Sequence, residues 1–220
     1  MGSKLPRNKG KVPSLSVVRY AEIYRTMILY RGQYCDDEEL RYFKMPDFWQ
    51  WLCGDGKEGW QVKTFRSDLP DDYLRKAAII AFDGRMTLTV DEILWEKAKL
   101  GSKVPNFILG HEFAHLALDH HLGNATKKNF LLKQRNTDFA IIPPTPEELE
   151  ANFGGVVFQC GPVLEDVRWG AIDIANRAFS DVAQVEKAMR IVRLEAFKQE
   201  LNRQLEAELR RRSSLRRIVL

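Results

Sequence analysis

Cysteine is scarce in this chain, and the cysteines present form no recognisable pattern. Cys35, Cys53 and Cys160 are widely spaced and include no C-x-x-C motif, so we expect neither a disulfide framework nor a cysteine zinc site. Long apolar runs are also missing, and none approaches the roughly 18 residues that a membrane-spanning helix needs. No apolar run follows the basic residues near the N-terminus, so no signal peptide is predicted. The expected compartment is the cytoplasm.

A large excess of charge of one sign is absent as well. The 34 Lys and Arg residues against 30 Asp and Glu give a net charge of only +4 over 220 residues, which is a weak indication of nucleic-acid binding. With 45% hydrophobic and 29% charged residues, the composition is that of an ordinary globular protein that can bury a sizeable core.

The most informative stretch of the chain is His111-Glu112-Phe113-Ala114-His115, an H-E-x-x-H motif. Side chains four residues apart share one face of a helix, so His111 and His115 can direct imidazole nitrogens at one metal ion. Glu112 projects beside that ion, where it can take a proton from a water molecule bound to zinc. The motif therefore predicts a zinc-binding helix that carries its own general base.

The other histidines lie close behind the motif, at His120 and His121. His121 occupies the third-ligand position of the metzincin pattern H-E-x-x-H-x-x-G-x-x-H. That pattern needs a glycine where the helix turns back, and this chain has Leu118 there. His121 is thus a weaker candidate for the third ligand, and His120 is expected near the site or on the surface.

Two short apolar segments before the motif predict a small sheet. Residues 77–82 and 86–90 are separated by Asp83-Gly84, a strong hairpin signal, and residues 61–66 alternate enough to suggest a strand before them. We expect these strands to form a β-meander. An amphipathic helix is predicted for residues 14–32, and the aromatic cluster at 48–52 is expected to be buried core.

A candidate for the third metal ligand lies on a second predicted helix downstream. Thr145 is a good N-cap and Pro146 suits the first helical position. Glu148 and Asn152 then share a face, so Glu148 can complete a metal site while Asn152 braces a ligand histidine. Thr145-x-x-Glu148 also matches a capping box, in which Glu148 would bond to its own helix start. Glu147 and Glu150 are alternative ligands.

Together these motifs resemble the ImmA/IrrE metallopeptidases, whose pattern is H-E-x-x-H, often with a further His, followed by a helix bearing E-x-x-A-(N/D). The matching residues are His111, Glu112, His115 and His120, and then Glu148, Ala151 and Asn152. The resemblance spans roughly residues 15–195. It departs from the family at Phe153-Gly154-Gly155 and at Gly161-Pro162, which replace the familiar small and apolar residues. We expect the glycines within the helix to let the second helix approach the first closely.

The resemblance implies an α+β fold with a zincin-like minimal metallopeptidase core, in which a small sheet packs on the motif helix and a second ligand helix. His111, His115 and Glu148 would bind Zn²⁺, with Mn²⁺ as the alternative, and Glu112 would be catalytic. Asn152 and His120 would not bind the metal but would lie next to the ligands and help to orient them. The implied activity is peptide hydrolysis of narrow specificity on a separate helix-turn-helix repressor, which would release stress-response or mobile-element genes.

The predicted organisation is a flexible basic segment at 1–13, a metallopeptidase domain at 14–180 and an amphipathic helical tail at 181–220. The apolar stripe of the tail changes phase near Val192–Leu194, which suggests a bend. Its end, residues 210–217, carries five Arg, which are either a solvated helix end or a contact for nucleic acid. The rival hypothesis to a peptidase is a regulatory binding module, of toxin–antitoxin type, that keeps the fold but not the catalysis.

Overall fold

The computed structural model describes residues 14–35, 42–54, 59–66, 77–82, 85–120 and 145–218, with Phe82 and 212–218 described by their backbone alone. Within these ranges the chain is α+β, mostly helical, with one three-stranded sheet. The elements in chain order are α1 (Val17–Tyr34), α2 (Met45–Gly54), β1 (Trp60–Phe65), β2 (Ala77–Phe82), β3 (Arg85–Asp91), α3 (Glu92–Lys99), α4 (Lys103–Ala117), α5 (Pro146–Cys160), the 3₁₀ helix η3 (Gly161–Glu165), α6 (Ala171–Arg177), α7 (Val182–Val192) and α8 (Glu195–Ile218).

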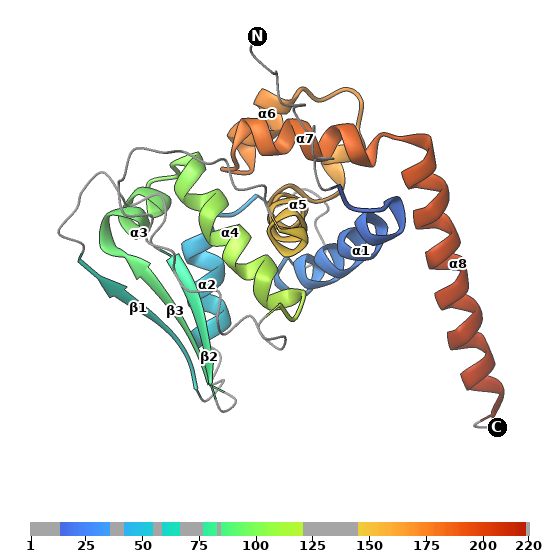
Figure 1. The fold of residues 1–220 in the computed structure, drawn as a ribbon, viewed down its shortest axis with the longest axis horizontal. Coiled ribbons are helices and arrows are strands. Elements are labelled where there is room, and N and C mark those ends of the chain that lie inside the picture. The colour runs from blue at the N-terminus through green and yellow to red at the C-terminus, as the bar shows by residue number, and fades with distance from the viewer. Residues whose placement is uncertain are drawn as a thin grey trace, which may run out of the picture.

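These elements lie in successive layers across the long axis of the molecule (Figure 1). The sheet is at one side, α4 packs between β2 and α5, and α1 packs on α5. The last helix, α8, packs on α1 at the opposite side from the sheet, while α7 packs on α5 with α6 beside it. The expected helix over 14–32, the motif helix and the helix that begins at Pro146 are all confirmed.

The sheet corrects one prediction, because its strand order is β1-β3-β2 and not that of a meander. β2 and β3 form the expected antiparallel pair, with Ile79 opposite Leu88, although Asp83 and Gly84 themselves lie outside the described residues. β1 instead pairs parallel to β3, with Val62 opposite Leu88. A two-residue turn forces neighbouring strands together, but residues 66–76 separate β1 from β2, so β1 is free to pair with the far edge of β3.

Aromatic side chains fill the core between α2, α4 and α5. The ring centroids of Phe48, Phe113 and Phe158 lie 4.4 to 4.7 Å from one another, in tilted and edge-on contacts. Phe48 and Trp49 are each only 1% exposed, so the aromatic cluster at 48–52 contributes buried core, as predicted.

Helices α4 and α5 approach each other so closely that their backbones touch. A Cβ added to Gly155 would lie 2.9 Å from the carbonyl carbon of Gly110 and from the amide nitrogen of His111. A Cβ on Gly154 would lie 3.1 Å from the Cβ of Ala114. Both glycines therefore allow the close approach that the sequence suggested, and this approach brings the start of α5 to the motif on α4.

The start of α4 is held by a buried asparagine. Asn106, which is 0% exposed, accepts a hydrogen bond from the amide of Met45 and donates two, to the carbonyl groups of Ala98 and Ser102. These bonds tie α4 to α2 and α3. The helix begins at Lys103.

The tail is two helices, as the phase change predicted, because α7 ends at Val192 and α8 begins at Glu195. α8 is fixed to α1 by Gln204, which donates to the carbonyl of Val18, and by the ion pair of Arg25 with Glu208. None of the helices in the described ranges is both long and apolar enough to cross a membrane.

Candidate metal site

His111 and His115 lie one turn apart on α4 and face the same way, as the motif predicted. Their Nε2 atoms are 3.0 Å apart, and both side chains are largely buried, with 14% and 18% of their surface exposed. Two imidazole nitrogens are thus presented to one point at the α4–α5 interface.

Glu148, in the first turn of α5, completes the group. Its two carboxylate oxygens lie 3.4 Å from Nε2 of His111 and 3.6 Å from Nε2 of His115. One ligand atom from each of the three residues falls within 4.8 Å of the others, so the group can hold a metal ion. The hydroxyl of Thr145 accepts a hydrogen bond from the backbone amide of Glu148, so capping uses this residue's backbone while its side chain turns to the histidines.

The donor set fits a zinc ion. Two imidazole nitrogens and one carboxylate oxygen are ligands that zinc accepts, and three protein ligands leave a fourth position for water or substrate. Among the described residues, the three-residue group contains neither of the alternative ligands Glu147 and Glu150. The third alternative, His121, lies outside the described residues.

Asn152 orients the first histidine. Its Oδ1 lies 3.1 Å from Nδ1 of His111, so that nitrogen carries the proton and donates it to the amide oxygen. The lone pair of His111 is then on Nε2, the atom that faces Glu148. The sequence predicted this contact; the effect of Asn152 on metal binding stays a prediction.

His120 lies behind the second histidine, also as predicted. Its Nδ1 is 2.8 Å from Nδ1 of His115, and its Nε2 is 3.0 Å from Oε2 of Glu150. Glu150 also accepts hydrogen bonds from Arg19 on α1, so its carboxylate is turned away from the three-residue group. Burial opposes ionisation of Glu150, but Arg19 and His120 outweigh it and lower the pKa of this carboxyl.

Glu112 lies beside the group, on the side of the sheet. Burial raises the pKa of Glu112 to about 7; the charge of Glu148 acts in the same direction, while His111 and the backbone amide of Ile79 oppose the shift. A carboxyl group with a pKa near neutrality can both accept and return a proton at physiological pH. The contact with Ile79, on β2, had no signal in the sequence.

The electrostatics of the group favour a cation. Burial alone would lower the pKa of His111, but hydrogen bonds and charges from Glu148, Glu112 and Asn152 outweigh it and raise that pKa above its ordinary value. The same carboxylates that stabilise an imidazolium would stabilise a divalent metal ion.

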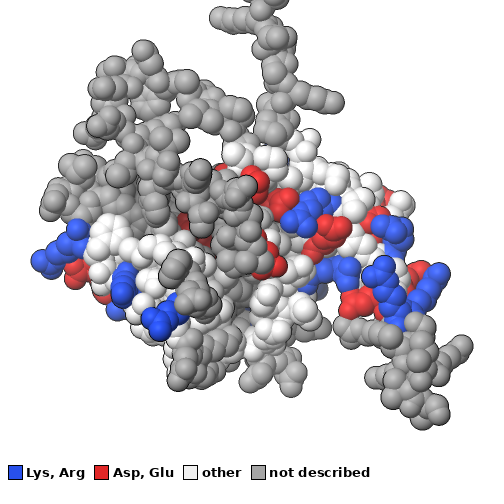
Figure 2. Space-filling view, turned by 60° about the horizontal axis from the view of Figure 1, so that its bottom comes forward, with Lys and Arg blue, Asp and Glu red and all other residues white. Residues whose placement is uncertain are grey.

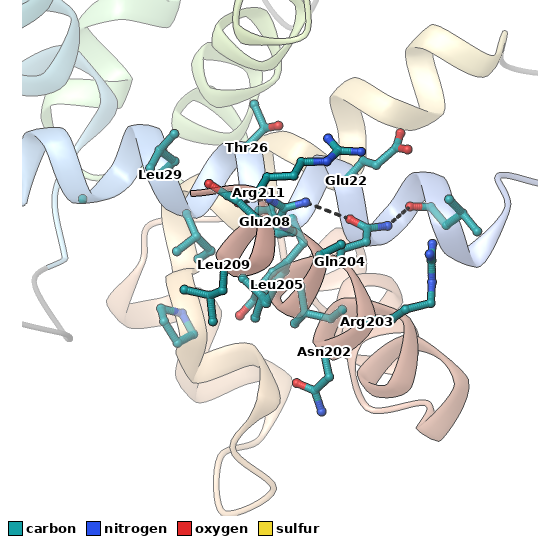
Figure 3. Close-up of a pocket in the computed structure, with 18 of the residues that line it drawn as sticks. Glu22, Thr26, Leu29, Asn202, Arg203, Gln204, Leu205, Glu208, Leu209 and Arg211 are labelled. Atoms are coloured by element: carbon teal, nitrogen blue, oxygen red, sulfur yellow. Dashed lines mark hydrogen bonds and ion pairs between the residues drawn. The ribbon is translucent and has the colours of Figure 1, made fainter. Parts of the chain in front are cut away.

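A groove lies away from the metal group, between α1 and α8. This groove has a volume of about 1490 Å³, and its apolar part includes Leu29, Leu205 and Leu209 (Figure 3). Leu29 and Leu209 are each 64% exposed, and Glu22 and Arg211 lie among the charged lining residues. None of the metal-group residues lines it.

Basic and acidic side chains are interspersed over the described part of α8 (Figure 2). Arg203 pairs with Glu200 and Arg210 with Glu206. The described tail therefore presents mixed charge and no uniform basic surface. The side chains at 212–217, with the remaining arginines of the predicted nucleic-acid contact, lie outside the described residues.

Comparisons of the chain with protein-family models, with curated proteins and with solved structures find no match. The features of this chain that point to a function are therefore the geometry of the group and the H-E-x-x-H motif.

Proposed function

We propose that this protein is a zinc-dependent endopeptidase with a zincin-like core of the ImmA/IrrE type. The observation that carries the proposal is the convergence of His111, His115 and Glu148, from two helices, beside a glutamate whose pKa is raised to about 7. A metal scaffold without catalysis would need the three ligands but would have no use for Glu112.

Zinc held by His111, His115 and Glu148 would supply Lewis-acid chemistry, by polarising the peptide carbonyl and making a water molecule more acidic. Glu112 takes a proton from the attacking water as its oxygen bonds to the carbonyl carbon. Glu112 then gives that proton to the amide nitrogen as the C–N bond breaks. Asn152 and His120 keep the two imidazole rings oriented throughout.

The proposed substrate is a separate helix-turn-helix repressor, cut at few sites so that stress-response or mobile-element genes are released. This part of the proposal rests on the resemblance of the two motifs, in their order along the chain, to the ImmA/IrrE pattern. Mn²⁺ is the alternative metal, because it also accepts imidazole and carboxylate ligands.

The decisive experiment co-expresses the chain with the repressor encoded beside it and follows the repressor by immunoblot. Wild type is expected to cleave it, while Glu112→Gln, which preserves side-chain size, should bind zinc normally and leave the repressor intact. Equal cleavage by both proteins would remove Glu112 from catalysis and defeat the proposed mechanism.

The ligand set has its own test in metal content. Glu148→Ala should lose most of its zinc, measured by elemental analysis of the purified full chain, because only two protein ligands remain. Glu147→Ala is the matched control, since it removes a carboxylate from the same helical turn but outside the group, and should retain zinc.

A regulatory binding module is the second candidate, and the groove between α1 and α8 is the observation that favours it. Its exposed leucines could contact a protein partner without any cleavage. In this case Leu209→Ser would abolish derepression while Glu112→Gln would derepress as well as wild type. The peptidase proposal expects the reverse for Glu112→Gln.

A further inference from the structure

The chain turns back sharply after α4, and this turn brings His120 to the metal group. Asp119 adopts a left-handed conformation with φ 58°; the amide of His120 bonds to the carbonyl of His115, and that of Asp119 to the carbonyl of Leu116. This pair of bonds is a Schellman motif. It places the ring of His120 against that of His115, with their centroids 4.9 Å apart.

The hydrogen bonds beyond His115 can run in only one direction if His115 is a ligand. When its Nε2 binds a metal ion, its proton must be on Nδ1, which donates to Nδ1 of His120 over 2.8 Å. His120 then carries its proton on Nε2, which donates to Oε2 of Glu150 over 3.0 Å. The series of hydrogen bonds thus ends on the carboxylate of Glu150, which when ionised accepts hydrogen bonds but cannot donate one.

Glu150 is held in place by the N-terminal helix. Arg19 on α1 donates from Nε and from a terminal nitrogen to the two carboxylate oxygens of Glu150, at 2.9 and 2.5 Å. This two-point contact fixes the carboxylate in the orientation that His120 needs. The side chain of Glu150 is 12% exposed and that of His120 8%, so water competes little for these bonds.

We propose that His120 and Glu150, anchored by Arg19, form a positioning relay that holds His115 in its metal-binding tautomer and orientation. This inference rests on the proposed metal site and adds to it. Asn152 contacts His111 directly, whereas the support of His115 passes through two side chains and reaches α1. Residue 150 is then a determinant of metal affinity although it is not a ligand.

The test measures zinc affinity of the purified full chain by competition with a chromophoric chelator. Glu150→Met keeps side-chain length but removes the acceptor, and is expected to weaken zinc binding about 10- to 100-fold, the usual effect of losing a ligand's hydrogen-bond partner. Arg19→Met breaks the same ion pair but leaves the carboxylate for His120, so its effect should be clearly smaller. Glu22→Gln, which removes only the other acidic partner of Arg19, is the control and should bind zinc as wild type does.

A spectroscopic readout separates positioning from stability. In the Co²⁺-substituted protein, the visible ligand-field bands of folded Glu150→Met should change in position or intensity, while those of Glu22→Gln should not. If Glu150→Met fails to fold by circular dichroism, His120→Phe replaces it, because it keeps the ring and removes both nitrogens.

Each outcome has a clear consequence. Unchanged zinc affinity in Glu150→Met, or equal losses in Glu150→Met and Arg19→Met, would overturn the relay and reduce the ion pair to a structural contact. The proposed function would survive either result as long as binding still depends on Glu148. Absence of zinc binding by the wild type would overturn both.

Discussion

Asn152 accepts a hydrogen bond from Nδ1 of His111 at 3.1 Å, from a position one helical turn beyond Glu148. One face of α5 therefore supplies both a candidate metal ligand and the group that contacts another candidate ligand on α4. The geometry of the site is thus a property of the α4–α5 interface as a whole, and changes in that interface should be measurable as changes in metal binding.

Replacement of Asn152 should reveal how much its hydrogen bond contributes. Asn152→Leu is expected to weaken zinc binding about 10- to 100-fold, because Nδ1 of His111 loses its acceptor and the ring loses its orientation. Asn152→Asp retains an acceptor and should stay within a few-fold of wild type. Chelator competition measures both constants, and equal losses in the two variants would contradict the proposed role.

The stability of the metal-free protein should fall as the pH rises from about 5 to about 8. In the unfolded chain Glu112 ionises near its ordinary value of 4.5, but in the folded protein its pKa is raised to about 7. Between these values the folded state binds more protons, so the free energy of unfolding decreases with pH, by at most about 3 kcal/mol. The pKa of His111 is also raised in the folded protein. This residue therefore lowers the free energy of unfolding further as the pH rises through its folded-state pKa.

Urea unfolding in the presence of a chelator, at several pH values, measures this slope. Glu112→Gln should flatten the part of the slope due to Glu112, and saturating zinc should oppose the fall because it binds the deprotonated groups. A slope that Glu112→Gln leaves unaltered would show that the glutamate is not responsible.

Gly155→Ala should lower both the stability of the protein and its affinity for zinc. The added methyl group would meet the backbone of Gly110 and His111 at 2.9 Å, and a backbone cannot move aside as a flexible side chain can. We expect a loss of about 1–3 kcal/mol of stability together with weakened zinc binding, since α5 must shift away from the ligand helix. The control is Gly32→Ala, within α1, where nothing lies within 4 Å of the new methyl group. Gly32→Ala should increase the stability by up to about 1 kcal/mol, and thermal unfolding of the two variants measures the difference.

Asp119→Gly should leave the site intact and increase stability modestly. Its φ of 58° is left-handed, a conformation that glycine adopts without steric cost, so a gain of up to about 1 kcal/mol is expected. Asp119→Val should instead destabilise the turn and, through the displaced His120, weaken zinc binding. The comparison is made by chemical unfolding and zinc titration of both variants.

The sequence predicted the local parts of this molecule well, because they depend on spacing within one helix. The four-residue separations of His111 from His115 and of Glu148 from Asn152 each place two side chains on one face. That both faces meet at one point follows from packing of α4 on α5, and only the glycines at 154 and 155 hinted at it.

What the sequence could not predict depends on contacts between distant segments. Arg19 and Glu150 are separated by 131 positions, and nothing in the pattern of either helix pairs them. The parallel pairing of β1 with β3 was missed for a related reason, since periodicity identifies strands but not their neighbours. The contact of Ile79 with Glu112 was missed for both reasons, because it joins two distant segments and depends on where strand β2 lies in the sheet.

The position of Glu112 beside Ile79 also bears on an edge of the sheet. β2 is an edge strand of the described sheet, and an edge strand offers unpaired amides to any other strand that approaches, which is how sheets aggregate. The backbone amide of Ile79 lowers the pKa of Glu112, which places this carboxyl beside part of that edge. Loss of Glu112 would therefore also change the surroundings of this strand edge, in addition to its effect on the proposed cleavage.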